Sequence, residues 1–214
     1  MALQLYYITD RRQFPGDAQE QEQRLLAKIA ECAAAGVEYI QLREKDLNIR
    51  ALENLALKAM AALGGSRTRL LINSRTDVAL ACGAHGVHLP ANDLAASEVR
   101  SVFARAGKSN PVIGVSAHSV HEVASAEAHG ASFAVFAPVF EKSGSANPEG
   151  LEELRRICHR AEAAQPSMPV WALGGVTLEN AQQCAAAGAA GIAAIRLFQQ
   201  NDVDAIVKKL REAA

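Results

Sequence analysis

Short apolar segments alternate with longer segments of helical periodicity along the whole chain. The apolar segments are rich in β-branched and aromatic residues, as expected of strands that are buried on both faces. In the first segment between them, Leu25, Ile29 and Cys32 recur at helical spacing. We therefore predict eight strands, each followed by a helix, with the strands at 3–8, 37–43, 69–73, 86–89, 111–116, 132–137, 169–173 and 191–196.

An internal repeat supports this count. Four segments each run from the end of an alanine-rich helix, through a glycine, into a strand, and successive glycines are 47, 47 and 58 residues apart. A glycine at this position can take the left-handed conformation that ends a helix. One period has about the length of two β-α units, so the repeat predicts eight units in all. The four glycines are Gly36, Gly83, Gly130 and Gly188.

Strands that alternate with helices indicate a parallel sheet, and eight such units in 214 residues match a compact (β/α)8 TIM barrel of the α/β class. An open, doubly wound sheet is the alternative. The glycines mark every second strand across the whole chain, which favours the barrel. No long Gly/Ser linker or block of charge divides the units, so we expect residues 1–214 to form a single domain.

Composition limits the kinds of molecule that this protein is expected to bind and the compartment in which it is expected. The formal net charge is −1 and the pI is about 6.6, so nothing attracts nucleic acid or anionic membranes in bulk, and any phosphate must bind at a local site. No apolar run approaches the roughly 18 residues of a membrane span, and the N-terminal residues lack an export signal. The four cysteines have no metal-binding spacing, so reduced thiols are expected. We expect a cytoplasmic protein.

In a (β/α)8 barrel the carboxyl ends of all strands meet at one face, where such enzymes place their chemistry. Polar residues stand at those ends in this sequence, so they are expected to gather around one mouth. They are Thr9, Asp10, Gln41, Arg43, Lys45, Asn73, His88, Asp93, Ser116, His118, Gly174, Gly175 and Arg196.

The segment QLREK at 41–45 indicates an anion site. Side chains alternate along a strand, so Gln41, Arg43 and Lys45 are expected to point the same way, into the mouth. Arginine binds phosphate oxygens with two parallel hydrogen bonds, and lysine supplies a point charge. The alternative is a set of ion pairs with nearby carboxylates, namely Glu44, Asp46 or Asp10.

The segment WALGGVT at 171–177 predicts a second anion site. Gly174 and Gly175 follow a strand and precede a helix, where backbone N–H groups can approach a ligand closely. Phosphate sites recur in the loops after strands seven and eight of such barrels. Arg196 could bind the same phosphate, cap a helix or pair with a carboxylate. None of the six histidines has zinc-binding spacing, and His88 and His118 near the mouth fit either a structural or a catalytic role.

The assembled motifs resemble the thiamine-phosphate synthase family, together with its relatives the thiazole tautomerases. The similarity extends nearly from end to end. Its motifs are YYITD at 6–10, YIQLREKD at 39–46, LLINSRTDVALACGAHGVHLPANDL at 70–94, GVSAHS at 114–119, FAPVF at 136–140, ALGGV at 172–176 and AGAAGIAAI at 187–195.

The resemblance implies a transferase of thiamine biosynthesis that joins a hydroxymethylpyrimidine pyrophosphate to a thiazole phosphate and releases pyrophosphate. It also implies Mg²⁺ and basic side chains around the pyrophosphate, with Arg43, Lys45 and Ser116 acting in catalysis. Asp93 would bind the metal, and Gly175 would contact the thiazole phosphate. The residues implied to hold the pyrimidine pyrophosphate are Gln41, Arg43, Lys45, Asn73 and Ser116.

Three positions depart from the family pattern. Ser74 replaces an aspartate that usually supplies a second magnesium carboxylate, so weaker metal binding is expected. A Thr-x-Thr-Lys segment is replaced at 141–151, where Lys142 and two serines offer similar groups. Ile195 and Arg196 replace the usual valine and serine after the last strand.

Two other functions therefore remain open. One is a metal-independent, tautomerase-like relative that acts on a thiazole phosphate; its catalytic histidine is expected near Pro138, where this sequence has none. The other is a non-catalytic barrel that binds a phosphorylated metabolite. The alanine-rich helices would suit a homodimer, or equally packing on the barrel.

Overall fold

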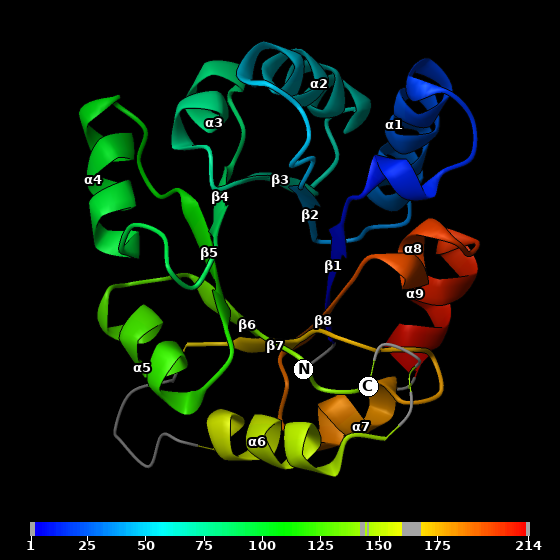
Figure 1. The fold of residues 1–214 in the computed structure, drawn as a ribbon, viewed down its shortest axis with the longest axis vertical. Coiled ribbons are helices and arrows are strands. Elements are labelled where there is room, and N and C mark those ends of the chain that lie inside the picture. Colours follow the sequence, from blue (N-terminus) through cyan, green and yellow to red (C-terminus); the bar gives the residue numbers. More distant parts are fainter. Residues whose placement is uncertain (1–2, 142–143, 145, 160–167, 213–214) are drawn as a thin grey trace.

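Eight parallel strands close into a barrel in which each strand pairs with the next and β8 pairs with β1 (Figure 1). The computed structural model describes residues 3–141, 144, 146–159 and 168–212. The predicted (β/α)8 barrel is confirmed. The strands are β1 Gln4–Ile8, β2 Tyr39–Leu42, β3 Arg69–Asn73, β4 Gly86–Leu89, β5 Val112–Ala117, β6 Phe133–Phe136, β7 Val170–Ala172 and β8 Gly191–Ala194.

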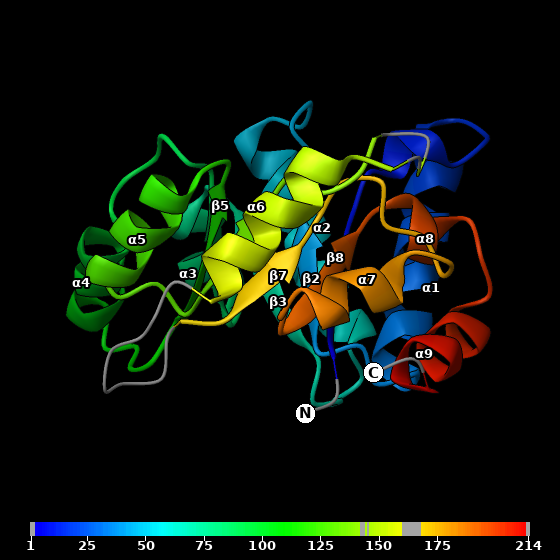
Figure 2. The same ribbon diagram turned by 90° about the horizontal axis from the view of Figure 1, so that it is seen from below.

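Helices surround the barrel in both views (Figures 1 and 2). Nothing among the described helices is long and apolar enough to cross a membrane. A short 3-10 helix, η1, spans Arg11–Gln13. The α-helices are α1 Ala18–Ala34, α2 Ile49–Ala62, α3 Thr76–Cys82, α4 Ala96–Arg105, α5 Val120–Ala128, α6 Pro148–Cys158, α7 Ala181–Ala186, α8 Arg196–Gln199 and α9 Val203–Glu212.

The last predicted strand, 191–196, was too long. β8 ends at Ala194, and Ile195 already has helical backbone angles (φ −97°, ψ −72°), so Arg196 opens α8 instead of ending a strand. The repeated glycines are as predicted: all four lie between a helix and the next even-numbered strand, with φ between 71° and 94°. These are left-handed values that glycine adopts without a steric penalty.

The core has two parts. The larger part lies between the strands and the surrounding helices. The smaller part fills the barrel itself, where Phe133 stacks on Trp171 with ring centroids 3.7 Å apart and Tyr6 packs edge-on against both rings. The barrel is therefore a packed core and not a pore, which leaves its carboxyl-terminal mouth as the place for polar chemistry.

Candidate active site

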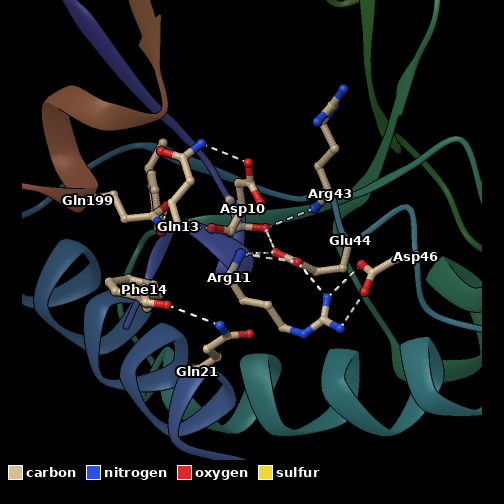
Figure 3. Close-up of polar contacts among 11 residues, drawn as sticks. Asp10, Arg11, Gln13, Phe14, Gln21, Arg43, Glu44, Asp46 and Gln199 are labelled. Atoms are coloured by element: carbon tan, nitrogen blue, oxygen red, sulfur yellow. Dashed lines mark hydrogen bonds and ion pairs between the residues drawn. The ribbon is translucent and has the colours of Figure 1, made fainter. Parts of the chain in front are cut away.

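A buried carboxylate joins the ends of β1 and β2. Glu44 is 5% exposed and accepts a hydrogen bond from the Thr9 hydroxyl at 2.6 Å. The Arg11 backbone N–H and guanidinium also donate to it, at 3.1 and 2.9 Å (Figure 3). Burial raises the pKa of Glu44, while the bonds from Thr9 and Arg11 oppose that rise. A buried carboxylate needs such donors, so these contacts hold the two strand ends together.

Arg11 also binds the second carboxylate of this segment. Its guanidinium donates to both oxygens of Asp46, at 2.8 and 2.7 Å, and this hydrogen bonding is the main cause of a lowered Asp46 pKa (Figure 3). The nearby Asp10 accepts a hydrogen bond from Gln13 at 2.7 Å. All three carboxylates considered as partners for the QLREK cations therefore have other donors.

Arg43 and Lys45 are left without a carboxylate partner. The Arg43 backbone N–H donates to the Thr9 hydroxyl at 3.0 Å, and its side chain points away from the Glu44 cluster (Figure 3). Across the described ranges, neither cation forms an ion pair. Both line one cavity of about 310 Å³ with Asp10 and Arg12. The structure thus presents two cations outside any ion pair of the described residues at this side of the mouth.

Two amide side chains continue the mouth from β2 to β3. Gln41 is 2% exposed, and its Nε2 donates to Asn73 Oδ1 at 3.3 Å. The expected alternation along QLREK holds for Gln41 and Arg43, which face the mouth, and Lys45 lies beyond the strand in an exposed turn. The amides can therefore orient a polar ligand beside the cations.

A histidine lies inside the barrel beneath Ser116. His88 is 3% exposed, with Nε2 2.9 Å from Ser116 Oγ and Nδ1 3.1 Å from the Tyr6 hydroxyl. Burial, and to a lesser degree the charge of Arg43, lowers the pKa of His88 to about 3. The imidazole is therefore neutral at ordinary pH. It contacts the predicted site through Ser116.

Ser74 and Asp93 meet at the β3 and β4 side. The Ser74 hydroxyl donates to Asp93 Oδ2, and the Leu94 backbone N–H donates to Oδ1 at 2.8 Å. Ser74 has a left-handed backbone with φ of 62°. Asp93 and Ser116 line one cavity of about 210 Å³. Among the described residues, no cluster of three His, Cys, Asp or Glu side chains could hold a metal, so a magnesium ion bound by Asp93 would take its other ligands from water or a substrate.

Another part of the mouth is formed by the loops that follow β7 and β8. Gly174, Gly175 and Thr177 line a cavity of about 430 Å³ together with Ile195 and Arg196. In the part of the chain that the structure describes, the N–H groups of Gly175 and Val176 have no acceptor. A Cβ on Gly175 would lie 2.0 Å from the Glu141 carbonyl oxygen, and its φ of 63° is left-handed. Only glycine fits this close approach of two loops.

Comparison with known proteins identifies the family. The family model described as thiamine monophosphate synthase matches residues 5–198. The chain belongs to the thiamine monophosphate synthase family. Membership makes it a transferase of thiamine biosynthesis.

Named relatives in this family cover nearly the whole chain. The thiamine-phosphate synthase of Methanoregula boonei is 38% identical over 99% of this chain and 93% of its own length. That of Clostridium acetobutylicum is 33% identical over 89% and 84%. Among solved structures, a thiamine phosphate pyrophosphorylase from Pyrococcus furiosus has a TM-score of 0.79 at 29% identity, over 99% of this chain and 95% of that one.

The site contains residues that the sequence alone did not single out. The roles of Tyr6 and Arg11 were not predicted, and Glu44 was considered only as a partner for the QLREK cations, because these contacts join segments that are far apart along the chain. One signal was available for Glu44: it stands between Arg43 and Lys45 and so faces the other way along the strand. Lys142, predicted to bind phosphate, lies outside the described residues.

Proposed function

We propose that this member of the family joins a hydroxymethylpyrimidine pyrophosphate to a thiazole phosphate and releases pyrophosphate, forming thiamine phosphate. The observation that carries the proposal is the pairing of Glu44 and Asp46 with Arg11. This pairing leaves Arg43 and Lys45 free to bind an anion. Across the mouth, the unpaired N–H of Gly175 offers a second, separate anion site.

The reaction needs positioned charge and no protein nucleophile. The bond between the pyrimidinylmethyl carbon and the pyrophosphate oxygen breaks, and its electron pair leaves with the pyrophosphate. The thiazole nitrogen then donates its lone pair to that carbon. Arg43 and Lys45 stabilise the negative charge of the leaving group, so electrostatics and proximity supply the rate.

The other mouth residues orient the two substrates. Gln41, Asn73 and Ser116 lie beside Arg43 and would hold the pyrimidine pyrophosphate. The loop at Gly174 and Gly175, with Arg196 in the same cavity, would bind the thiazole phosphate. The proposal takes residues 1–214 as one barrel domain.

Magnesium belongs to this proposal as a partner of the pyrophosphate. Mg²⁺ is commonly bound by one or two carboxylates together with substrate phosphates. Asp93 offers one carboxylate, and the Ser74 hydroxyl lies beside it. When bound, the ion would neutralise charge on the pyrophosphate. A second carboxylate is missing at position 74, so we expect weak metal affinity without substrate.

The test is direct synthesis. The protein is mixed with both substrates and millimolar Mg²⁺, and thiamine phosphate and pyrophosphate are measured by chromatography. Equal amounts of both products are expected, formed far more slowly in Arg43→Ala. No product from folded protein would reject the proposal, and tight binding of thiamine phosphate without turnover would indicate a non-catalytic barrel.

A second candidate function has specific support. The Ser74 hydroxyl occupies one oxygen of Asp93, and His118 Nδ1 lies 2.8 Å from the Ala137 carbonyl oxygen, next to the position where a tautomerase histidine was expected. These contacts suit a metal-independent relative that isomerises a thiazole carboxylate phosphate. Turnover of that compound with chelator present, lost in His118→Asn, would favour this function over the synthase.

A further inference from the structure

Three residues form a hydrogen-bonded chain that runs from inside the barrel to its mouth. Tyr6 lies in β1, His88 in β4 and Ser116 in β5. We propose that Tyr6 and His88 fix the direction of these hydrogen bonds so that the Ser116 hydroxyl faces the substrate as a donor. The inference rests on the proposed function for the identity of that substrate. Tyr6 and His88 would be positioning residues that act through Ser116.

Packing fixes the plane of the imidazole. The His88 ring centroid lies 5.7 Å from that of Tyr6 and 6.2 Å from that of Phe133. Gly114, beside His88 on β5, leaves room for both rings: a Cβ there would lie 2.8 Å from His88 Nδ1 and 2.4 Å from Phe133. Within this plane, a ring turned over by 180° would put carbon atoms in place of both nitrogens and lose both hydrogen bonds, so Nδ1 stays toward Tyr6 and Nε2 toward Ser116.

The chain of hydrogen bonds has only one favourable direction. His88 is buried, and in the described ranges its ring nitrogens meet only the hydroxyls of Tyr6 and Ser116 and no carboxylate. The ring is therefore neutral, with a hydrogen on one nitrogen while the other accepts. Tyr6 is fully buried, burial raises its pKa, and its hydroxyl has no hydrogen-bond partner besides His88 in the described ranges. Tyr6 must therefore donate to Nδ1, since its hydrogen would otherwise be buried without an acceptor. The His88 hydrogen then lies on Nε2 and is donated to Ser116 Oγ.

This direction leaves the Ser116 hydrogen available. A serine hydroxyl donates once, and here one of its lone pairs accepts from His88. Ser116 is only partly buried and lines the same cavity as Asp93. Its hydrogen therefore points to an acceptor atom in that cavity, either a pyrimidine ring nitrogen or a pyrophosphate oxygen. In the reverse direction the Ser116 hydroxyl would donate its hydrogen to His88, and none would be left for an acceptor atom of the substrate.

The direct test is the tautomer of His88. Protein labelled with ¹⁵N-histidine is measured by long-range ¹H–¹⁵N correlation between pH 5.5 and 8, with His88→Gln used to assign the signal. We expect a neutral ring with its hydrogen on Nε2 throughout this range. A ring with its hydrogen on Nδ1, or a charged ring, would overturn the inference. This measurement needs no substrate, so it holds even if the synthase proposal fails.

A matched pair of substitutions tests the effect on substrate. The glutamine amide nitrogen can take the place of Nε2, whereas the asparagine nitrogen reaches only the place of Nδ1. His88→Gln should keep the KM for the pyrimidine pyrophosphate within about threefold of wild type, and His88→Asn should raise it about tenfold, with the KM for thiazole phosphate unchanged in both. Equal KM values in the two folded variants would contradict the inference.

A double variant and two partial ligands complete the test. The double variant His88→Asn/Ser116→Ala should raise the KM for the pyrimidine pyrophosphate no more than Ser116→Ala does alone, because His88 acts through Ser116. Inorganic pyrophosphate and free hydroxymethylpyrimidine are then titrated onto wild type and Ser116→Ala. Loss of affinity for one of them identifies the acceptor; unchanged affinity for both would overturn the inference.

Discussion

The two sides of the barrel mouth offer anions very different surroundings. On the β1 to β5 side the groups are side chains, with Arg43 and Lys45 left unpaired because Arg11 binds the neighbouring carboxylates. On the β7 and β8 side the proposed anion site is built on backbone N–H groups, with Gly175 so close to another loop that no Cβ fits. Anion binding on the first side depends on the charge of side chains, and on the second side it depends on the shape of the backbone.

This difference predicts how each side responds to substitution. A side-chain site changes in strength when one side chain is replaced. A backbone site keeps its N–H groups whatever the surrounding side chains are, but it fails when the backbone cannot approach. Substitutions on the two sides should therefore affect the binding of different substrates.

The largest effect is expected for Arg43→Ala. Loss of one charged, bidentate contact to phosphate should lower kcat/KM by about 100-fold, which corresponds to about 2.7 kcal/mol of activation free energy. Steady-state kinetics with the pyrimidine pyrophosphate varied measures this loss. Arg50→Ala removes the same charge from an exposed position on α2 and should have little effect. Equal losses in both variants would mean that net charge, and not the Arg43 site, controls activity.

Gly175→Ala should come next and should act on the other substrate. The added methyl would displace the Glu141 carbonyl, so we expect about a 30-fold rise in the KM for thiazole phosphate, or about 2 kcal/mol. The matched control is Gly107→Ala, where φ is also positive (71°) but a Cβ would meet nothing within 4 Å. A rise in the KM for the pyrimidine pyrophosphate alone would reverse the assignment of the two sides.

Ser74→Asp should strengthen the side-chain side. A second carboxylate beside Asp93 should lower the Mg²⁺ concentration needed for half-maximal activity by about tenfold, or about 1.4 kcal/mol. Aspartate tolerates the left-handed backbone at this position better than most residues do. Titration of activity with Mg²⁺ measures the change, with Ser97→Asp on α4 as the control. An unchanged requirement would remove Asp93 from the metal site.

The smallest effect is a pH dependence of the stability of the protein that arises from His88. Unfolded His88 takes a proton near pH 6.5, whereas folded His88 does so only near pH 3, so wild type should lose stability as the pH falls below 6.5. The contribution approaches about 1.4 kcal/mol per pH unit. Urea unfolding at pH 5.5 and 7 should show this slope reduced in His88→Gln. An identical slope in wild type and variant would mean that folding does not lower the pKa of His88.

Much of the fold could be predicted from the sequence. Regular alternation of strands and helices, together with the glycines at Gly36, Gly83, Gly130 and Gly188, predicted the number of strands and the closed barrel. These are local signals, because a glycine ends its own helix whatever lies elsewhere. The end of β8 was wrong because an apolar run does not show where the backbone turns helical, as it does at Ile195.

The site was predictable in position but not in its pairing. The ends of parallel strands meet at one face, so the sequence predicts that Arg43, Asn73 and Asp93 share that face; their joint binding of a substrate stays a prediction. Which carboxylate pairs with which cation depends on distances between segments far apart in the sequence. Arg11, in η1 after β1, binds both Glu44 and Asp46. The Tyr6 contact to His88 joins residues 82 positions apart, and no periodic pattern indicates it.

The most direct measurement is a crystal structure with thiamine phosphate, pyrophosphate and Mg²⁺. The account predicts pyrophosphate against Arg43 and Lys45, the metal between it and Asp93, and the phosphate of the thiamine moiety on the Gly175 loop. Pyrophosphate on the glycine loop, or both anions away from Arg43, would contradict it.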